Sequence, residues 1–240
     1  MGVYHITYTP GLKEICLYLD EGCQLSCHGC ITNWHPKDYH LEEDSSSLEH
    51  RIINIDKVIG YLKTISFEKV IFLGKEPTVD KDFLPLARIL KKRFATYNVF
   101  LTNGLKYIDD KALDEVCISI KAITPRVFKE FTGKDRAKEV LENFKIYTRF
   151  SHMKVRAESV FVPGLIDIDE IEKIAKFIAE IDPDIPYRID GYIPYSEDDK
   201  SRRPTKVEME KAKKISERYL KSVSILHYGV KVKYRVERVY

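Results

Sequence analysis

The amino-acid sequence predicts an α/β fold, a partial (β/α)6 TIM-like barrel with an additional C-terminal strand, in one domain over residues 1–240. Short β-branched and aromatic segments alternate with amphipathic helical patterns along the chain, and this alternation favours a parallel sheet. Right-handed crossovers would curl six such units into an incomplete barrel. No internal repeat, low-complexity segment or long linker divides the sequence. A single barrel can therefore use all 240 residues.

The strands and helices of this barrel are expected from local patterns. Strands are expected in the apolar runs at 13–20, 69–74, 97–104, 116–121, 155–162 and 187–193. Helices are expected where apolar residues recur with helical spacing, at 55–64, 81–93, 137–150, 169–180 and 204–222. The last helix has Pro204, a good first helical residue, with Thr205 beside it. The alternating stretch VKVKYRVERV at 230–239 predicts the additional edge strand.

Composition excludes several classes of protein. Hydrophobic residues make up 44% of the chain and charged residues 32%, which is typical of a globular protein with an ionic surface. The net charge of +3 is too small to imply a nucleic-acid or membrane partner. The N-terminus lacks the pattern of a secretory signal, and no run of 18 apolar residues occurs. We therefore expect a cytoplasmic protein with no nucleic-acid partner and no membrane.

Three of the five cysteines, Cys23, Cys27 and Cys30, lie within the segment EGCQLSCHGC at 21–30. Random placement of five cysteines would produce such a Cys-x3-Cys-x2-Cys triplet with a probability of roughly 0.002. The odd number of cysteines argues against a secreted disulfide scaffold. The triplet also follows the first expected strand, and active sites of such barrels gather at the C-terminal ends of strands. These thiols are therefore predicted to bind a metal.

Two kinds of metal site and one structural interpretation fit the triplet. Three cysteines suit a four-iron cluster in which one iron lacks a protein ligand and is open to another molecule. A structural zinc site would need a fourth ligand, for which His28 or His35 could serve. The third interpretation is that the cysteines are simply buried. The spacing favours the open iron–sulfur cluster, and Trp34 is expected to anchor the loop by packing.

The triplet resembles the signature of the radical S-adenosylmethionine (SAM) superfamily, and further motifs recur in that superfamily's order along most of the chain. The resemblance implies that Cys23, Cys27 and Cys30 hold a [4Fe-4S] cluster whose free iron is chelated by the amino and carboxylate groups of SAM. It also implies that the reduced cluster cleaves SAM to methionine and a 5′-deoxyadenosyl radical. The single domain is then a radical SAM domain.

Two of these motifs follow the second and third expected strands. The stretch LGKEPTVD resembles the superfamily's Gly-Gly-Glu-Pro turn, which receives the SAM amino group. Gly74 and Glu76 match that turn, and Lys75 replaces its second glycine. A carboxylate and backbone carbonyls at a strand end can accept hydrogen bonds from an ammonium group. The stretch LTNG resembles the Thr-Asn-Gly motif, which contributes Asn103.

Three further segments resemble activating enzymes. In ISIKAITPRVFKEFTGK, Lys121 matches the glycyl-radical-enzyme activating enzymes of the pyruvate formate-lyase type, and Ser119 replaces their aspartate. In DGYIPYSED, Ser196 replaces the histidine of a Leu-Pro-Tyr-His segment. Gly29 resembles the glycine before the last cysteine in the activase of anaerobic ribonucleotide reductase. The resemblance thus implies SAM contacts at Gly29, Gly74, Lys75, Glu76, Asn103, Ser119, Lys121 and Ser196.

The resemblance implies an anaerobic oxidoreductase that takes a hydrogen atom from a partner, in the first place the glycine of a glycyl-radical enzyme. An electron donor such as ferredoxin or flavodoxin would reduce the cluster, and no catalytic residue is expected beyond the cluster and SAM. One alternative is a radical SAM enzyme that modifies a small molecule or another protein side chain. A more distant alternative is a zinc-binding module that is not an enzyme.

Overall fold

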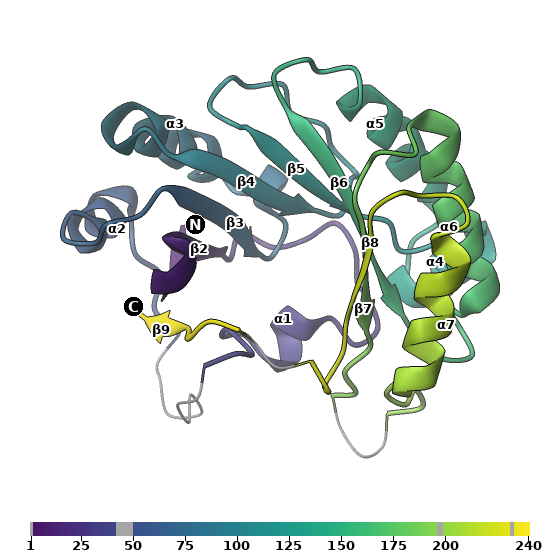
Figure 1. Ribbon diagram of the computed structural model, residues 1–240. Helices are drawn as coiled ribbons and strands as arrows, with labels where there is room; N and C mark the ends of the chain where they lie inside the picture. The colour runs from purple at the N-terminus through teal and green to yellow at the C-terminus, as the bar shows by residue number, and fades with distance from the viewer. Residues whose placement is uncertain (1, 42–49, 196–198, 231–232) are drawn as a thin grey trace.

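The computed structural model describes residues 2–41, 50–195, 199–230 and 233–240 (Figure 1). The described chain forms one nine-stranded sheet with the strand order β8-β7-β6-β5-β4-β3-β2-β1-β9. The strands are β1 Val3–Thr9, β2 Glu14–Leu19, β3 Lys69–Gly74, β4 Tyr97–Thr102, β5 Glu115–Ser119, β6 Lys154–Phe161, β7 Tyr187–Gly191, β8 Val223–Leu226 and β9 Glu237–Arg238.

Each strand from β2 to β8 is parallel to the next one. Strand β1 is antiparallel to β2, and β9 is antiparallel to β1. Within the described residues, the edge strands β8 and β9 do not pair with each other, so the barrel is partial. The parallel order places the carboxyl ends of β2 to β8 at one edge of the sheet.

The helices cover the convex side of this sheet, except α1, which lies on its concave side (Figure 1). They are α1 Ile31–Trp34, α2 Ile55–Leu62, α3 Phe83–Phe94, α4 Pro125–Thr132, α5 Ala137–Tyr147, α6 Ile168–Ile181 and α7 Lys206–Ser216. Helix α6 shows why these segments fold in this way, since Ile171, Ile174 and Ile178 recur at helical spacing and are all buried. Burial of each such side chain stabilises the fold by about 1.5–3 kcal/mol.

The two faces of the sheet differ in chemistry. In β5, Val116 and Ile118 belong to the hydrophobic core that lies under the helices. Because side chains alternate along a strand, Cys117 and Ser119 face the concave side. In β6, Ala157 belongs to the same core, and its neighbours in the strand face the concave side. The concave side is therefore where polar side chains of adjacent strands meet.

The predicted fold class and the six predicted strands are confirmed, with boundaries that differ by a few residues. Strands β1 and β8 were missed, because buried polar residues interrupt the apolar pattern of β1 and β8 has only four residues. The predicted edge strand at 230–239 is confined to Glu237–Arg238 among its described residues. The predicted helix 204–222 was too long, since α7 ends at Ser216. No helix among the described residues is long and apolar enough to cross a membrane.

Candidate functional site

The cysteine loop follows β2 and is bonded to residues at the ends of β3 and β4. The backbone N–H of Lys75 donates to the carbonyl of Leu19 at 2.9 Å, and the N–H of Glu76 donates to the carbonyl of Gly22 at 2.9 Å. The side-chain amide of Asn103, just after β4, lies 3.3 Å from the sulfur of Cys23. The structure thus brings residues of three predicted motifs together at the carboxyl edge of the sheet.

The other side of the cysteine loop is bonded to the end of α4. The N–H groups of Ser26 and His28 donate to the carbonyls of Thr132 at 2.9 Å and Phe131 at 2.7 Å. Carbonyls in the last turn of a helix have no partner within that helix, so they are free to accept these bonds. The loop that carries the three cysteines is consequently held between the β3 turn and α4.

Cys23 and Cys27 lie in an environment that disfavours isolated thiolates. Burial raises the pKa of Cys23, and burial raises the pKa of Cys27 to about 11. The charge of Cys30 raises both pKa values further, so the three sulfurs interact electrostatically. A bound metal cation would remove this penalty, because thiolates are soft anionic ligands that iron–sulfur clusters and zinc favour. The chemistry of the three donors therefore fits an iron–sulfur cluster.

The described residues contain no preformed group of three or more His, Cys, Asp or Glu side chains that could hold a metal ion. The cysteine sulfurs would then have to close around a metal as it binds, as is common for metal sites whose binding is coupled to folding. His28 is one of the two candidate fourth ligands for zinc. Its Nε2 lies 3.2 Å from a carboxylate oxygen of Asp199. Because Nε2 already has this partner, it is not free to bind zinc in this arrangement.

The turn after β3 approaches β2 closely at Gly74. This residue has a φ of 102°, and a Cβ there would lie 2.7 Å from the carbonyl oxygen of Leu19. Only glycine therefore fits this position without strain. The Gly74 carbonyl accepts a hydrogen bond from the hydroxyl of Thr32 at 2.9 Å, and the Lys75 ammonium donates to the side-chain oxygen of Asn33. Lys75 thus joins the turn to α1.

Glu76 is 4% exposed, and both of its carboxylate oxygens are bonded within the protein. Oε1 accepts hydrogen bonds from Thr78 and Thr102, each at 2.7 Å from the hydroxyl. Oε2 accepts from the backbone N–H of Asn103 at 2.7 Å. Burial raises the pKa of Glu76, although these donors oppose the shift. The carboxylate therefore ties the end of β3 to the end of β4.

A row of polar side chains crosses the concave face, and sequence reasoning found only Ser119 at one end of it, together with Lys121. The strand register places Ser119 beside Glu158 and Glu158 beside Arg188. Arg188 donates to Glu158 at 2.8 Å and to Asp190 at 2.9 Å. The Lys121 ammonium donates to the Ser119 hydroxyl at 2.6 Å. Charged residues at every second position of β6 and β7 were the signal for this row.

The carboxylates of this row have opposite pKa shifts. Burial opposes ionisation of Glu158, yet Arg188 and Lys121 hold its pKa below the usual value. Burial raises the pKa of Asp190 to about 6, and Arg188 only partly offsets that effect. The Asp190 side chain remains 30% exposed. The Asp190 carboxyl can therefore contact a polar ligand, and the surrounding protein provides a low dielectric constant at that contact.

The segment after β7, of which residues 192–195 and 199–205 are described, also reaches the cysteine loop. Asp199 accepts a hydrogen bond from the Tyr192 hydroxyl at 2.7 Å and contacts His28. Burial opposes its ionisation, but the donors Ser201 and Tyr192 hold the pKa of Asp199 below the usual value. Ser196, a predicted SAM contact, lies outside the described residues.

Gly29 has a specific structural role at this contact. A Cβ on Gly29 would lie 2.5 Å from the ring carbon Cζ of Tyr192, so the tyrosine ring rests directly on the glycine. The Trp34 ring stacks on the Tyr195 ring with centroids 4.4 Å apart. The expectation that Trp34 anchors the loop by packing is consistent with this stack, and its partner comes from the segment after β7.

The chain is similar in sequence to several known proteins. Residues 18–178 match the model of the Radical SAM superfamily. A protein of Methanocaldococcus jannaschii, provisionally named a glycyl-radical enzyme activating enzyme, is 31% identical over 221 residues, which are 89% of this chain and 81% of that protein. The GTP 3′,8-cyclase of Pasteurella multocida is 26% identical over 160 residues, or 64% of this chain and 46% of the cyclase.

Two solved structures have the same fold at low sequence identity. Streptococcus suis SuiB bound to its precursor peptide SuiA superposes with a TM-score of 0.67 at 14% identity, over 92% of this chain and 49% of SuiB. A domain of pyruvate-formate lyase-activating enzyme from Bacteroides vulgatus superposes with a TM-score of 0.53 at 20% identity, over 67% of this chain and 99% of that domain. This chain thus spans less than half of the cyclase and of SuiB.

Proposed function

This chain belongs to the radical SAM superfamily of enzymes, and on that basis we propose that residues 1–240 form one domain that cleaves SAM reductively. The observation that carries this proposal is the position of Cys23, Cys27 and Cys30 on one loop, bonded to the ends of β3, β4 and α4. These three residues would hold a [4Fe-4S] cluster. With SAM bound, the reduced cluster would supply the electron that releases methionine and a 5′-deoxyadenosyl radical.

We assign the binding of SAM to residues along the carboxyl edge and the concave face. In this proposal the carbonyl of Gly74 would accept from the amino group, and Glu76, whose carboxylate oxygens are bonded within the protein, would fix the position of the turn. Lys75 and Asn103 hold the turn and the cysteine loop in place. Ser119 and Lys121, which are bonded to each other, would contact the ribose end of SAM, and Gly29 and Ser196 complete the proposed set. Their neighbours Glu158, Arg188 and Asp190 could orient a polar group of the substrate.

The partner that we favour is a glycyl-radical enzyme, whose backbone glycine would lose a hydrogen atom. This choice is supported by the sequence motifs and by the name of the relative that is 31% identical. A radical SAM enzyme that modifies a small molecule or another protein side chain is the second candidate, since a GTP 3′,8-cyclase is among the relatives. We further propose an electron donor of the ferredoxin or flavodoxin class.

The test is anaerobic reconstitution with iron and sulfide, followed by assays of iron, visible absorbance and 5′-deoxyadenosine. The wild type should be brown, absorb broadly near about 400 nm and release 5′-deoxyadenosine when it is reduced with SAM. Alanine at Cys23, Cys27 or Cys30 should abolish both iron binding and SAM cleavage. Alanine at Cys117, a buried thiol of β5, is the matched control and should retain both.

Two outcomes would contradict the proposal. Full SAM cleavage in any one of the three alanine variants would show that its cysteine is not a ligand. A colourless protein that binds stoichiometric zinc would favour the binding module instead. The partner is tested separately, because a glycyl radical should appear in the electron paramagnetic resonance spectrum of a candidate partner only when this protein, SAM and reductant are all present.

A further inference from the structure

The segment after β7 contacts the two residues that separate Cys27 from Cys30. One of them, His28, places Nε2 3.2 Å from Oδ1 of Asp199. The other, Gly29, lies against the ring of Tyr192, whose hydroxyl donates to Oδ2 of Asp199 at 2.7 Å. The Asp199 side chain is 0% exposed, whereas the His28 side chain is 36% exposed. Asp199 is therefore the buried centre of this contact.

Backbone groups also orient the Asp199 carboxylate. The N–H of Ser201 donates to Oδ1 at 2.9 Å, and the N–H of Tyr195 lies 3.3 Å from Oδ2. Oδ1 thus joins Ser201 to His28 of the cysteine loop, whereas Oδ2 joins Tyr192 to Tyr195. A buried carboxylate with a full set of donors has little freedom to rotate, so the position of His28 follows from the position of the segment.

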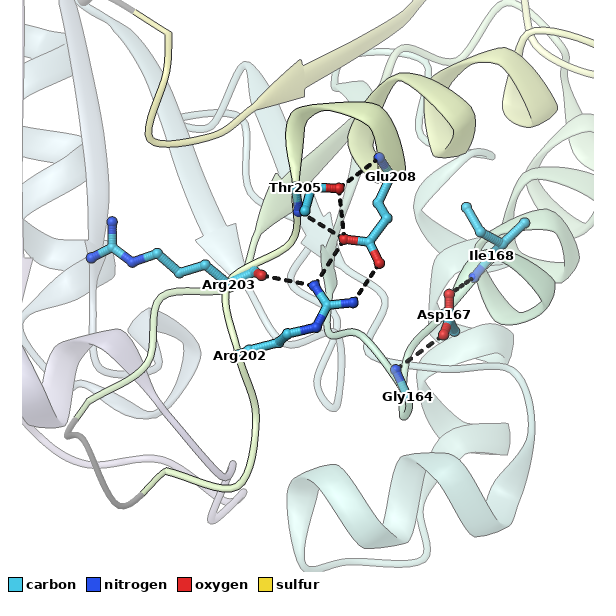
Figure 2. Close-up of polar contacts among 7 residues, drawn as sticks. All are labelled: Gly164, Asp167, Ile168, Arg202, Arg203, Thr205 and Glu208. Carbon is cyan, nitrogen blue, oxygen red and sulfur yellow. Dashed lines mark hydrogen bonds and ion pairs between the residues drawn. The ribbon is translucent and has the colours of Figure 1, made fainter.

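The segment itself is fixed where it enters α7. Figure 2 shows the Arg202 guanidinium donating to both carboxylate oxygens of Glu208, at 2.9 and 2.6 Å. Thr205 and Glu208 form a reciprocal capping box at the first turn of α7. A bidentate pair of this kind fixes the relative orientation of its two side chains and also stabilises their contact. Asp199 is consequently held close to a well-anchored helix start.

We propose that Asp199 is a positioning residue for the cysteine loop. It holds His28 and Tyr192 so that the Tyr192 ring and Asp199 cover residues 28–29 and limit the access of water and external reagents to Cys27 and Cys30. No sequence motif indicated this role. The contact of Asp199 with His28 and Tyr192 would also slow the loss of iron from the cluster, and this part of the inference rests on the proposed function.

The access of reagents can be measured without a cluster. The full chain, reduced and free of metal under argon, is treated with limiting iodoacetamide, which forms an S–C bond and releases iodide and a proton. Mass spectrometry of the peptides gives the rate at each cysteine. Asp199→Ala should raise the rates at Cys27 and Cys30 about tenfold, which corresponds to about 1.4 kcal/mol. The rate at Cys117, buried in β5, should stay unchanged.

Three further variants separate positioning from general stability. Tyr192→Phe keeps the ring over Gly29 but lacks the hydroxyl, so it should raise the rates about threefold and add nothing to Asp199→Ala. Asp199→Asn retains an acceptor for the Tyr192 hydroxyl and should stay within about threefold of the wild type. Asp184→Asn, which removes an exposed ion pair with Lys221 just before β7, should behave as the wild type.

Equal rates at Cys27 and Cys30 in the wild type and Asp199→Ala would overturn the proposal. An equal increase at Cys117 would overturn it as well, because it would mean that the whole domain had loosened; if Asp199→Ala does not fold, Tyr192→Phe decides. Reconstituted protein gives the second measurement, in which Asp199→Ala should lose iron to a chelator faster than the wild type. If no variant binds iron, the proposed function fails, and the alkylation rates still decide the role of Asp199.

Discussion

Glu76→Gln tests whether one buried carboxylate holds the ends of β3 and β4 together. In the wild type, Oε1 accepts bonds from Thr78 and Thr102, and Oε2 accepts from the N–H of Asn103. A glutamine can keep its oxygen at the Oε1 position. Its NH2 group then faces the N–H of Asn103, so that one acceptor is lost and two donors oppose each other.

The expected cost follows from these contacts. A hydrogen bond to a charged group contributes about 1.5–3 kcal/mol, and a buried donor without a partner costs about 1–3 kcal/mol. The smaller burial cost of the neutral amide offsets part of this loss. We therefore expect Glu76→Gln to lower the free energy of unfolding by about 2 kcal/mol and Glu76→Ala, which removes every acceptor, by about 4 kcal/mol.

The assay is urea unfolding of the reduced, metal-free protein at pH 8, followed by circular dichroism. Glu130→Gln is the matched control, since Glu130 pairs with Arg126 on the exposed surface of α4 and its substitution should leave the midpoint unchanged. A Glu76→Gln variant as stable as the wild type, with the same denaturant slope, would show that Glu76 is not the acceptor at this junction.

Three other substitutions have definite expected outcomes. Gly29→Ala should displace Tyr192 and lower iron retention. Gly164→Ala is the control, since Gly164 has a φ of 83° and nothing within 4 Å of the added Cβ, so this variant should carry only backbone strain. Equal iron loss in the two variants would refute the steric argument. Asp190→Asn removes a carboxyl group, and burial raises the pKa of that group from 3.8 to about 6. The stability that the carboxyl contributes is therefore fully present below its unfolded-state pKa of 3.8 and is lost as the pH rises through about 6. The unfolding free energy of the wild type relative to Asp190→Asn should thus fall by about 1–2 kcal/mol across that window, and a rise in urea titrations would contradict the sign. Ser119→Asp, in which the carboxylate keeps the contact with Lys121, should bind SAM about fivefold more tightly, because an ionised acceptor adds about 1 kcal/mol to the binding free energy. Calorimetry of the cluster-loaded protein measures this affinity. Unchanged or weaker binding would place Ser119 outside the SAM site.

The sequence by itself determined most of the local elements and the spacing of the three cysteines in their loop. Strand β3 occupies the predicted residues 69–74, and α6 begins and ends within one residue of its predicted bounds. Both have an uninterrupted hydrophobic pattern, which depends only on neighbours along the chain. The Cys-x3-Cys-x2-Cys spacing is equally local, since one short loop carries all three thiols. Such features need no knowledge of what packs against them.

Only the tertiary structure decided which distant residues meet. Strand register sets Ser119, Glu158 and Arg188 side by side, although no short stretch of sequence contains all three. His28 and Asp199 are 171 positions apart and meet because parallel strands bring the loops after β2 and β7 to one edge. The polar partners of Glu76 likewise come from the end of another strand. Periodicity indicates which face of a strand is buried, but the residue opposite depends on how the whole sheet is ordered.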